Sequence, residues 1–157
     1  MRLAFFQPDI PQNLGGAVRL AACLRAPIEV IEPCAFPLSD PALRRAALDY
    51  GGQAEIIRRR SWVEFIAAPE RRAGRLVLFT THGAKPYTEF AFQDGDTLLF
   101  GQESAGVPET VHDAAQARLI VPIAPDARSL NVVAAAAMAL GEALRQTRGF
   151  PGVGETR

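Results

Sequence analysis

The chain has 157 residues, 48% of them hydrophobic and 22% charged, and its 17 basic and 17 acidic residues give a formal net charge of zero. This composition is typical of one globular domain with its own core, and it argues against a basic protein that coats nucleic acid without specificity. The spacing of the two cysteines and two histidines fits no zinc cluster, so we expect no metal.

Short apolar runs and helix start signals predict alternating strands and helices. Asn13 is expected to cap the first helix, Pro41 to open the second, and Ser61 with Glu64 to form a capping box for the third. The predicted elements are, in chain order, a strand at 3–6, a helix at 17–24, a strand at 28–31, a helix at 41–48, a strand at 54–57, a helix at 61–67, strands at 76–80 and 97–100, a helix at 108–115, a strand at 119–121 and a helix at 131–147.

This alternation predicts an α/β fold, a single domain with a mostly parallel sheet and helices on both faces. Residues 1–150 are expected to form the domain and residues 151–157 a loose C-terminal tail. No apolar run is long enough to span a bilayer and no secretory leader is visible, so we expect a cytoplasmic protein without a membrane partner.

The last predicted helix is apolar on almost every side, with the run VVAAAAMAL at residues 132–140. A helix of this kind is buried on more than one side, whereas a sheet covers only one. We therefore expect its other side to meet a second copy of the chain in a homodimer.

Common phosphate-binding and hydrolytic motifs are missing. No GxGxxG follows a strand, and Gly101 and Gly106 have the spacing of a P-loop but are followed by Val107 and Pro108 where lysine and serine or threonine are needed. No GxSxG elbow is present. These gaps disfavour a dinucleotide-binding module, an NTPase and a serine hydrolase.

Three other segments carry polar residues that folding alone does not require. They are residues 8–20 (PDIPQNLGGAVRL), 100–109 (FGQESAGVPE) and 121–131 (VPIAPDARSLN). Each lies where an apolar run meets a turn, and open α/β sheets bind ligands beyond the carboxyl ends of their strands. Together the segments predict a pocket lined largely by backbone groups.

The three segments resemble the motifs of the TrmH-type SPOUT enzymes, the trefoil-knot RNA 2′-O-methyltransferases, and within them the TrmL subfamily, which are tRNA (cytidine/uridine-34) 2′-O-methyltransferases. The similarity covers nearly the whole chain. It implies a single-domain α/β knot with a deep trefoil knot in the C-terminal half, and an obligate homodimer. The sequence departs from the subfamily pattern at Gly16, His82, Val133-Ala134 and Gly141.

The resemblance also implies a substrate, a cofactor and a site. The implied reaction moves a methyl group from S-adenosyl-L-methionine to the ribose 2′-hydroxyl of the wobble nucleotide of tRNA, in leucine isoacceptors, and leaves S-adenosyl-L-homocysteine. The anticodon stem-loop would be the part bound. The implied cofactor-binding residues are Phe79, Thr80, Gly101, Val121, Ser129 and Leu130. The implied catalytic residues are Arg19, Asn13, Glu103, Ser129 and Asn131.

Arg19 is the central residue of this expectation. A guanidinium has no acceptor and hardly deprotonates, so we expect Arg19 to hold a phosphate and stabilise the developing alkoxide, with Glu103 orienting it. Two alternatives stay open: 2′-O-methylation of another tRNA or rRNA nucleotide, and a SPOUT-fold RNA-binding protein without catalysis. Sixteen of the 17 basic residues are arginine, clustered at 44–45, 58–60 and 71–75, and the sequence does not say which of them bind RNA.

Overall fold

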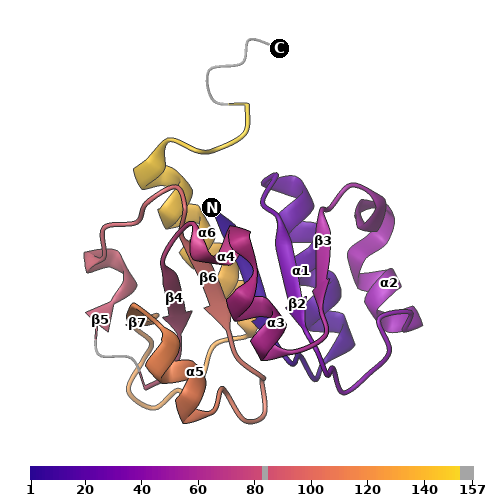
Figure 1. The fold of residues 1–157 in the computed structure, drawn as a ribbon, viewed down its shortest axis with the longest axis horizontal. Coiled ribbons are helices and arrows are strands. Elements are labelled where there is room, and N and C mark those ends of the chain that lie inside the picture. The colour runs from indigo at the N-terminus through magenta and orange to yellow at the C-terminus, as the bar shows by residue number, and fades with distance from the viewer. Residues whose placement is uncertain (83–84, 153–157) are drawn as a thin grey trace.

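A parallel sheet of seven strands forms the centre of the chain (Figure 1). The computed structural model describes residues 1–82 and 85–152. The strands lie in the order β3-β2-β1-β6-β4-β7-β5, and every neighbouring pair is parallel. In chain order they are β1 (Arg2–Phe6), β2 (Ile28–Ile31), β3 (Ile56–Arg59), β4 (Leu76–Phe79), β5 (Lys85–Pro86), β6 (Thr97–Phe100) and β7 (Ala117–Ile120).

Helices cover both faces of this sheet (Figure 1). Alternate residues of β1 show the division: Leu3 and Phe5 belong to one hydrophobic cluster, and Ala4 and Phe6 to another. The first cluster is covered by α1, α2 and α6, and the second by α3 and α5. The helices are α1 (Pro11–Cys23), α2 (Pro41–Ala47), α3 (Trp62–Ala67), α4 (Pro69–Arg72), α5 (Glu109–Ala114) and α6 (Val132–Thr147), with 3₁₀ turns η1 (Leu48–Gly52) and η2 (Tyr87–Glu89).

The predicted α/β class and the parallel sheet are confirmed, with small shifts at the element ends. The strand at 97–100 has the predicted bounds, whereas the third strand lies at 56–59 instead of 54–57. The two-residue strand β5 and the four-residue helix α4 were not predicted, because elements this short carry little periodicity. The trefoil knot stays a prediction, and residues 153–157 of the expected tail lie outside the described residues.

The prediction that Asn13 caps the first helix is wrong. The helix begins at Pro11, six residues before the predicted start at 17, and Ile10 occupies the N-cap position without a side-chain hydrogen bond. Proline suits the first helical position because its φ angle is already helical and its missing N–H would have no partner there. Asn13 therefore lies within the first turn, and its side chain is available for other contacts.

One of the two hydrogen bonds of the predicted capping box is confirmed. The Ser61 hydroxyl accepts a hydrogen bond from the Glu64 backbone N–H at 3.1 Å. The Glu64 carboxylate, however, accepts from the backbone N–H of Arg60 at 3.2 Å instead of that of Ser61. The reciprocal bond thus forms one residue earlier than the motif predicts.

Helix α6 buries one side in its own chain. Its buried residues are Ala136, Ala139, Leu140, Ala143 and Leu144, whereas the side chain of Met138 keeps 42% of its surface exposed. An apolar side therefore stays uncovered in the single chain. No helix among the described residues is long and apolar enough to cross a membrane.

Candidate active site

A chain of hydrogen bonds joins one residue from each of the three motif segments. The Asn131 side-chain amide donates to Asn13 Oδ1 at 3.0 Å, and Asn13 Nδ2 donates to Glu103 Oε1 at 3.0 Å. The residues are 118 and 90 positions apart in the sequence, so the fold alone brings them together. We refer to Asn13, Glu103 and Asn131 as the amide–carboxyl chain.

Local structure fixes the Asn131 end of the amide–carboxyl chain. Asn131 is the N-cap of α6, and its Oδ1 accepts hydrogen bonds from the backbone N–H groups of Val133 and Ala134 at 2.9 and 3.3 Å. An asparagine at this position satisfies helix N–H groups that have no partner in the helix, and its amide nitrogen is left to donate elsewhere. The sequence prediction that a helix begins after Asn131 is confirmed.

Asp9 also contributes to this site, although sequence reasoning missed it. Its carboxylate accepts hydrogen bonds from the backbone N–H groups of Glu103 and Ser104, both at 3.2 Å, and from the Ser104 hydroxyl. The Asp9 N–H donates in return to Glu103 Oε2 at 3.4 Å. These contacts, which we call the Asp9 clamp, hold the loop that carries Glu103 against the loop after β1.

The two carboxyl groups titrate in opposite directions. The pKa of Asp9 is lowered to about 2, mainly by a hydrogen bond from the Glu103 side chain and further by the Ser104 hydroxyl and the two backbone N–H groups. The pKa of Glu103 is raised, first by burial and then by the adjacent Asp9 carboxylate. Asp9 therefore stays ionised while Glu103 keeps its proton to a higher pH than an exposed glutamate, and perturbed groups of this kind are frequent in catalytic sites.

Arg19 does not lie with Glu103. Its side chain is exposed, and its guanidinium carbon lies 5.6 Å from the centroid of the Tyr50 ring in a cation–π contact. Arg19 lies six positions after Asn13 in α1, which places it about 9 Å further along the helix axis and on another side of the helix. The expectation that Glu103 orients Arg19 is wrong within one chain, because the Glu103 carboxylate binds Asn13 and the Asp9 backbone instead.

The expected cofactor-binding residues follow three neighbouring strands. In the sheet β4 lies between β6 and β7, so Thr80, Gly101 and Val121 lie at one edge, and the Thr80 N–H donates to the Leu119 carbonyl at 3.0 Å. The side chain of Phe79 is only 7% exposed, so it can offer a ligand little more than its backbone.

The loop at residues 121–131 completes this edge. Every residue from Pro122 to Asn131 is exposed, including the apolar side chains of Ile123 and Leu130, each 39% exposed. One backbone hydrogen bond, from the Ala127 N–H to the Ala124 carbonyl, joins residues of this loop to each other. Exposed apolar side chains on a loop with few internal backbone hydrogen bonds fit a ligand with an adenine ring and a methionine tail. Ser129 lies in this loop, but no described hydrogen bond joins it to the amide–carboxyl chain.

Gly101 has a structural reason to be glycine. The loop after β6 closes through two backbone hydrogen bonds between Gln102 and Gly106, both at 2.9 Å, and Gly106 has a φ of +67°. A Cβ atom on Gly101 would lie 2.7 Å from the Gly106 carbonyl carbon. The loop that carries Glu103 therefore needs glycine at position 101 whether or not a ligand approaches it.

Two departures from the subfamily pattern touch each other. Gly16 in α1 faces Val133 in α6, and a Cβ atom on Gly16 would lie 3.3 Å from Val133 Cγ2. A larger residue at position 16 would need a smaller neighbour at position 133, so the two differences are coupled.

Among the described residues, no group of three histidine, cysteine, aspartate or glutamate side chains could hold a metal ion.

Comparison with known proteins finds relatives along nearly the whole chain. Residues 1–141 match the SpoU rRNA methylase family. A tRNA (cytidine(34)-2′-O)-methyltransferase of Beijerinckia indica is 53% identical over 144 residues, which are 92% of this chain and 90% of that protein. The protein of the same name from Escherichia coli K12 is 36% identical over 154 residues, covering 97% of this chain and 96% of that one.

Solved structures have the same fold. One, from work on the 2-OH methylation of C/U34 on tRNA, superposes with a TM-score of 0.87 at 40% identity, covering 92% of this chain and 94% of that one. The SpoU methyltransferase AviRb from Streptomyces viridochromogenes, in complex with AdoMet, has a TM-score of 0.83 at 30% identity, covering 93% of this chain and 60% of that one. The chain belongs to the SpoU rRNA methylase family.

Proposed function

We propose that this protein transfers a methyl group from S-adenosyl-L-methionine to the ribose 2′-hydroxyl of nucleotide 34 in tRNA. The amide–carboxyl chain carries the proposal, because it places a carboxyl group of raised pKa beside the strand ends at which such a fold binds ligands. The names of the Beijerinckia and Escherichia coli relatives support nucleotide 34 as the target.

The cofactor would lie along the strand ends of β4, β6 and β7. We assign its binding to Phe79, Thr80, Gly101, Val121, Ser129 and Leu130, with backbone groups holding its polar atoms and the apolar side chains of the loop at 121–131 covering its ring. When bound, S-adenosylmethionine supplies a methyl group on a positively charged sulfur, so the reaction needs no metal to create an electrophile.

Glu103 is the residue of the amide–carboxyl chain that can take a proton. Burial and the neighbouring Asp9 raise its pKa toward the pH range in which a general base is effective. Asn13 donates to one of its oxygens and Asn131 holds Asn13 in turn, so the two amides fix the direction of the carboxyl group. We propose that Glu103 accepts the proton of the ribose 2′-hydroxyl and that Ser129 forms part of the wall beside it.

Arg19 would bind the phosphate next to the reacting ribose and stabilise negative charge on its oxygen. Its position supports a homodimer in which Arg19 of one copy serves the site of the other. Asn13 is bound within its own chain, whereas Arg19 lies on an exposed side of the same helix. The uncovered apolar side of α6 around Met138 would form part of the interface. The enzyme would act in the cytoplasm on the anticodon stem-loop.

Ribose methylation mapped in tRNA from a strain that lacks this protein tests the proposal. We expect leucine tRNAs to lose the 2′-O-methyl group at position 34 and to regain it when the strain expresses the wild-type chain but not the Glu103→Gln variant. Calorimetry with S-adenosylmethionine should show binding to both proteins. An unchanged position 34, with methylation lost elsewhere, would assign the enzyme another nucleotide; no loss anywhere would indicate an RNA-binding protein without catalysis.

A further inference from the structure

A hollow of about 560 Å³ lies outside the candidate active site, where β2 and β3 end. Its apolar lining comes from Pro33, Phe36, Pro37 and Leu38, and its cations are Arg58 and Arg60. The size is within the range of pockets that hold one small ligand. Nothing in the proposed reaction uses these residues.

The hollow adjoins the first motif segment. The loop that forms its apolar side is tied to that segment by a hydrogen bond from the Ala35 N–H to the Pro8 carbonyl at 3.2 Å. Pro8 directly precedes Asp9, the residue of the Asp9 clamp. The Gln7 N–H donates to the Ile31 carbonyl at 2.8 Å, so the ends of β1 and β2 are joined as well. The hollow therefore lies next to the loop that carries the Asp9 clamp.

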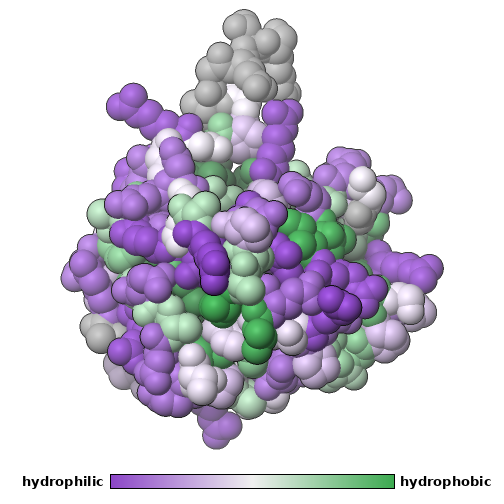
Figure 2. All heavy atoms as spheres, in the orientation of Figure 1, coloured by the Kyte–Doolittle hydropathy of each residue, from purple (hydrophilic) through white to green (hydrophobic). Residues whose placement is uncertain are grey.

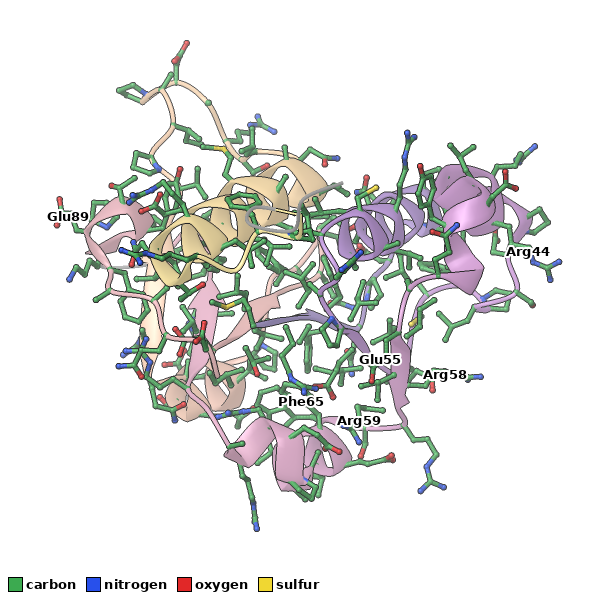
Figure 3. All side chains as sticks on the ribbon, turned by 90° about the horizontal axis from the view of Figure 1, so that it is seen from above. Arg44, Glu55, Arg58, Arg59, Phe65 and Glu89 are labelled. Atoms are coloured by element: carbon green, nitrogen blue, oxygen red, sulfur yellow. The ribbon has the colours of Figure 1, made fainter. Side chains whose placement is uncertain are left out.

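The arginines at positions 58–60 divide into two kinds. Arg59 is structural: its guanidinium binds the fully buried Glu29 at 2.6 Å and Glu70 at 3.3 Å. Arg58, the residue before Arg59 in β3, points to the opposite face, as successive residues of a strand do, and Arg60 follows the end of the strand with its side chain exposed. Figure 3 shows Arg58 extending away from the body of the molecule while Arg59 turns toward α3. Only the outer two arginines line the hollow.

Both outer arginines can bind a further anion. Arg58 donates to Glu32 at 2.8 Å and Arg60 to Glu64 at 3.0 Å, and their side chains are 61% and 87% exposed. Exposed ion pairs of this kind are weak, and a guanidinium has five N–H donors, so an arriving phosphate can share or replace the carboxylate. Figure 2 shows a mainly hydrophilic face with hydrophobic areas between its hydrophilic residues. The hollow itself combines apolar residues with two arginines, and this mixture suits a base with its phosphate.

We propose that the hollow binds one unstacked nucleotide of the RNA substrate, adjacent to the nucleotide that is methylated. Its base packs against Phe36 and the prolines, and its phosphate lies on Arg58 and Arg60. Aromatic side chains with arginines are a frequent means of binding single-stranded RNA, because every base has a face to stack and every nucleotide has a phosphate. This inference rests on the proposed function and names where the substrate is held.

The test is RNA affinity of the full chain, measured by fluorescence anisotropy with a labelled anticodon stem-loop. We expect the double variant Arg58→Gln, Arg60→Gln to weaken RNA binding about tenfold or more and to lower the salt dependence by about two phosphate contacts. Phe36→Leu should weaken binding about fivefold, because one stacked base is lost. The affinity for S-adenosylmethionine should not change in either variant.

Arg145→Gln is the matched control. Arg145 is 68% exposed and pairs with Glu142 at 2.8 Å, so it resembles Arg58 in exposure and pairing but lies far along the chain in α6. The RNA affinity of the Arg145→Gln variant should lie within twofold of that of the wild type. Wild-type RNA affinity in both hollow variants would overturn the inference while leaving methyl transfer intact. If cytidine monophosphate bound the hollow as tightly as the stem-loop, the site would belong to a free nucleotide and the inference would also fail.

Discussion

Replacing Asp9 with asparagine tests whether the Asp9 clamp positions Glu103. The carboxylate accepts hydrogen bonds from the backbone N–H groups of Glu103 and Ser104 and from the Ser104 hydroxyl. Asparagine keeps one oxygen, which can accept from the Glu103 N–H, but it turns an NH₂ group toward the Ser104 N–H. The Ser104 N–H thus loses a charged acceptor and faces a donor, and the Ser104 hydroxyl, which donates to the same oxygen, must turn to accept from the NH₂ group.

The size of the effect follows from these contacts. A hydrogen bond to a charged group contributes about 1.5–3 kcal/mol, and the partial exposure of Asp9 reduces this to about 1–2 kcal/mol. If the loss falls on the position of Glu103 in the transition state, the rate of methyl transfer should fall about five- to thirtyfold. The Ser104→Ala variant removes only the hydroxyl donor and should lower the rate less.

Single-turnover methyl transfer with saturating S-adenosylmethionine and RNA measures this rate, and its pH dependence separates positioning from loss of structure. Glu103 must lose its proton to act as a base, so the rate should rise with pH through the pKa of Glu103. Because the Asp9 charge helps to raise that pKa, Asp9→Asn should move the midpoint to lower pH. A rate within twofold of the wild type, with an unmoved midpoint, would refute the clamp.

Three further variants test the packing and the assembly. Gly101→Ala should lower the free energy of unfolding by about 1–3 kcal/mol, measured with urea, because its methyl group would lie against the Gly106 carbonyl. Asp96→Ala should lower it by about 3–5 kcal/mol, because it leaves the Arg75 guanidinium, bound to Asp96 at 2.7 and 2.8 Å, without its buried partner. Met138→Lys should shift sedimentation from dimer to monomer, because it places a charge on the exposed apolar side of α6.

Matched controls make these outcomes decisive. Gly52→Ala should be nearly neutral, since a Cβ atom there meets nothing within 4 Å. Glu142→Gln removes a surface ion pair with Arg145, whose side chain is 68% exposed, and should lower stability much less than Asp96→Ala. An unchanged free energy of unfolding in Gly101→Ala would contradict the packing interpretation. The same would hold for the ion pair if Asp96→Ala were as stable as Glu142→Gln. A Met138→Lys protein that stays dimeric would contradict the proposed interface.

The site shows where sequence reasoning succeeds and where it fails. The start of the last helix, predicted at residue 131, was placed within one residue because its cap bonds, from Asn131 to residues 133 and 134, are local. Asn13 has the same cap preference, but proline at position 11 starts the helix earlier and leaves its side chain for Glu103. Capping preference alone cannot distinguish these two asparagines.

The sequence alone could not predict contacts between distant segments. Asp9 was passed over because its partners lie 94 and 95 residues away, and an aspartate after a strand is common in turns. The sequence shows the arginines at 58–60 as one cluster. Which of them is structural depends on the faces of β3 that Arg58 and Arg59 occupy and on the end of the strand before Arg60. The hollow depends on the shape of the loop after β2, which no periodic pattern describes.

The most direct test of the proposed function compares two synthetic anticodon stem-loops of a leucine tRNA. They differ only at nucleotide 34, which carries a ribose 2′-hydroxyl in one and a 2′-deoxyribose in the other. With the purified protein and labelled S-adenosylmethionine, the ribose form should accept one methyl group per molecule, and mass spectrometry should place it on the 2′-oxygen of nucleotide 34. Equal labelling of the two forms, or a methyl group on any other nucleotide, would contradict the account.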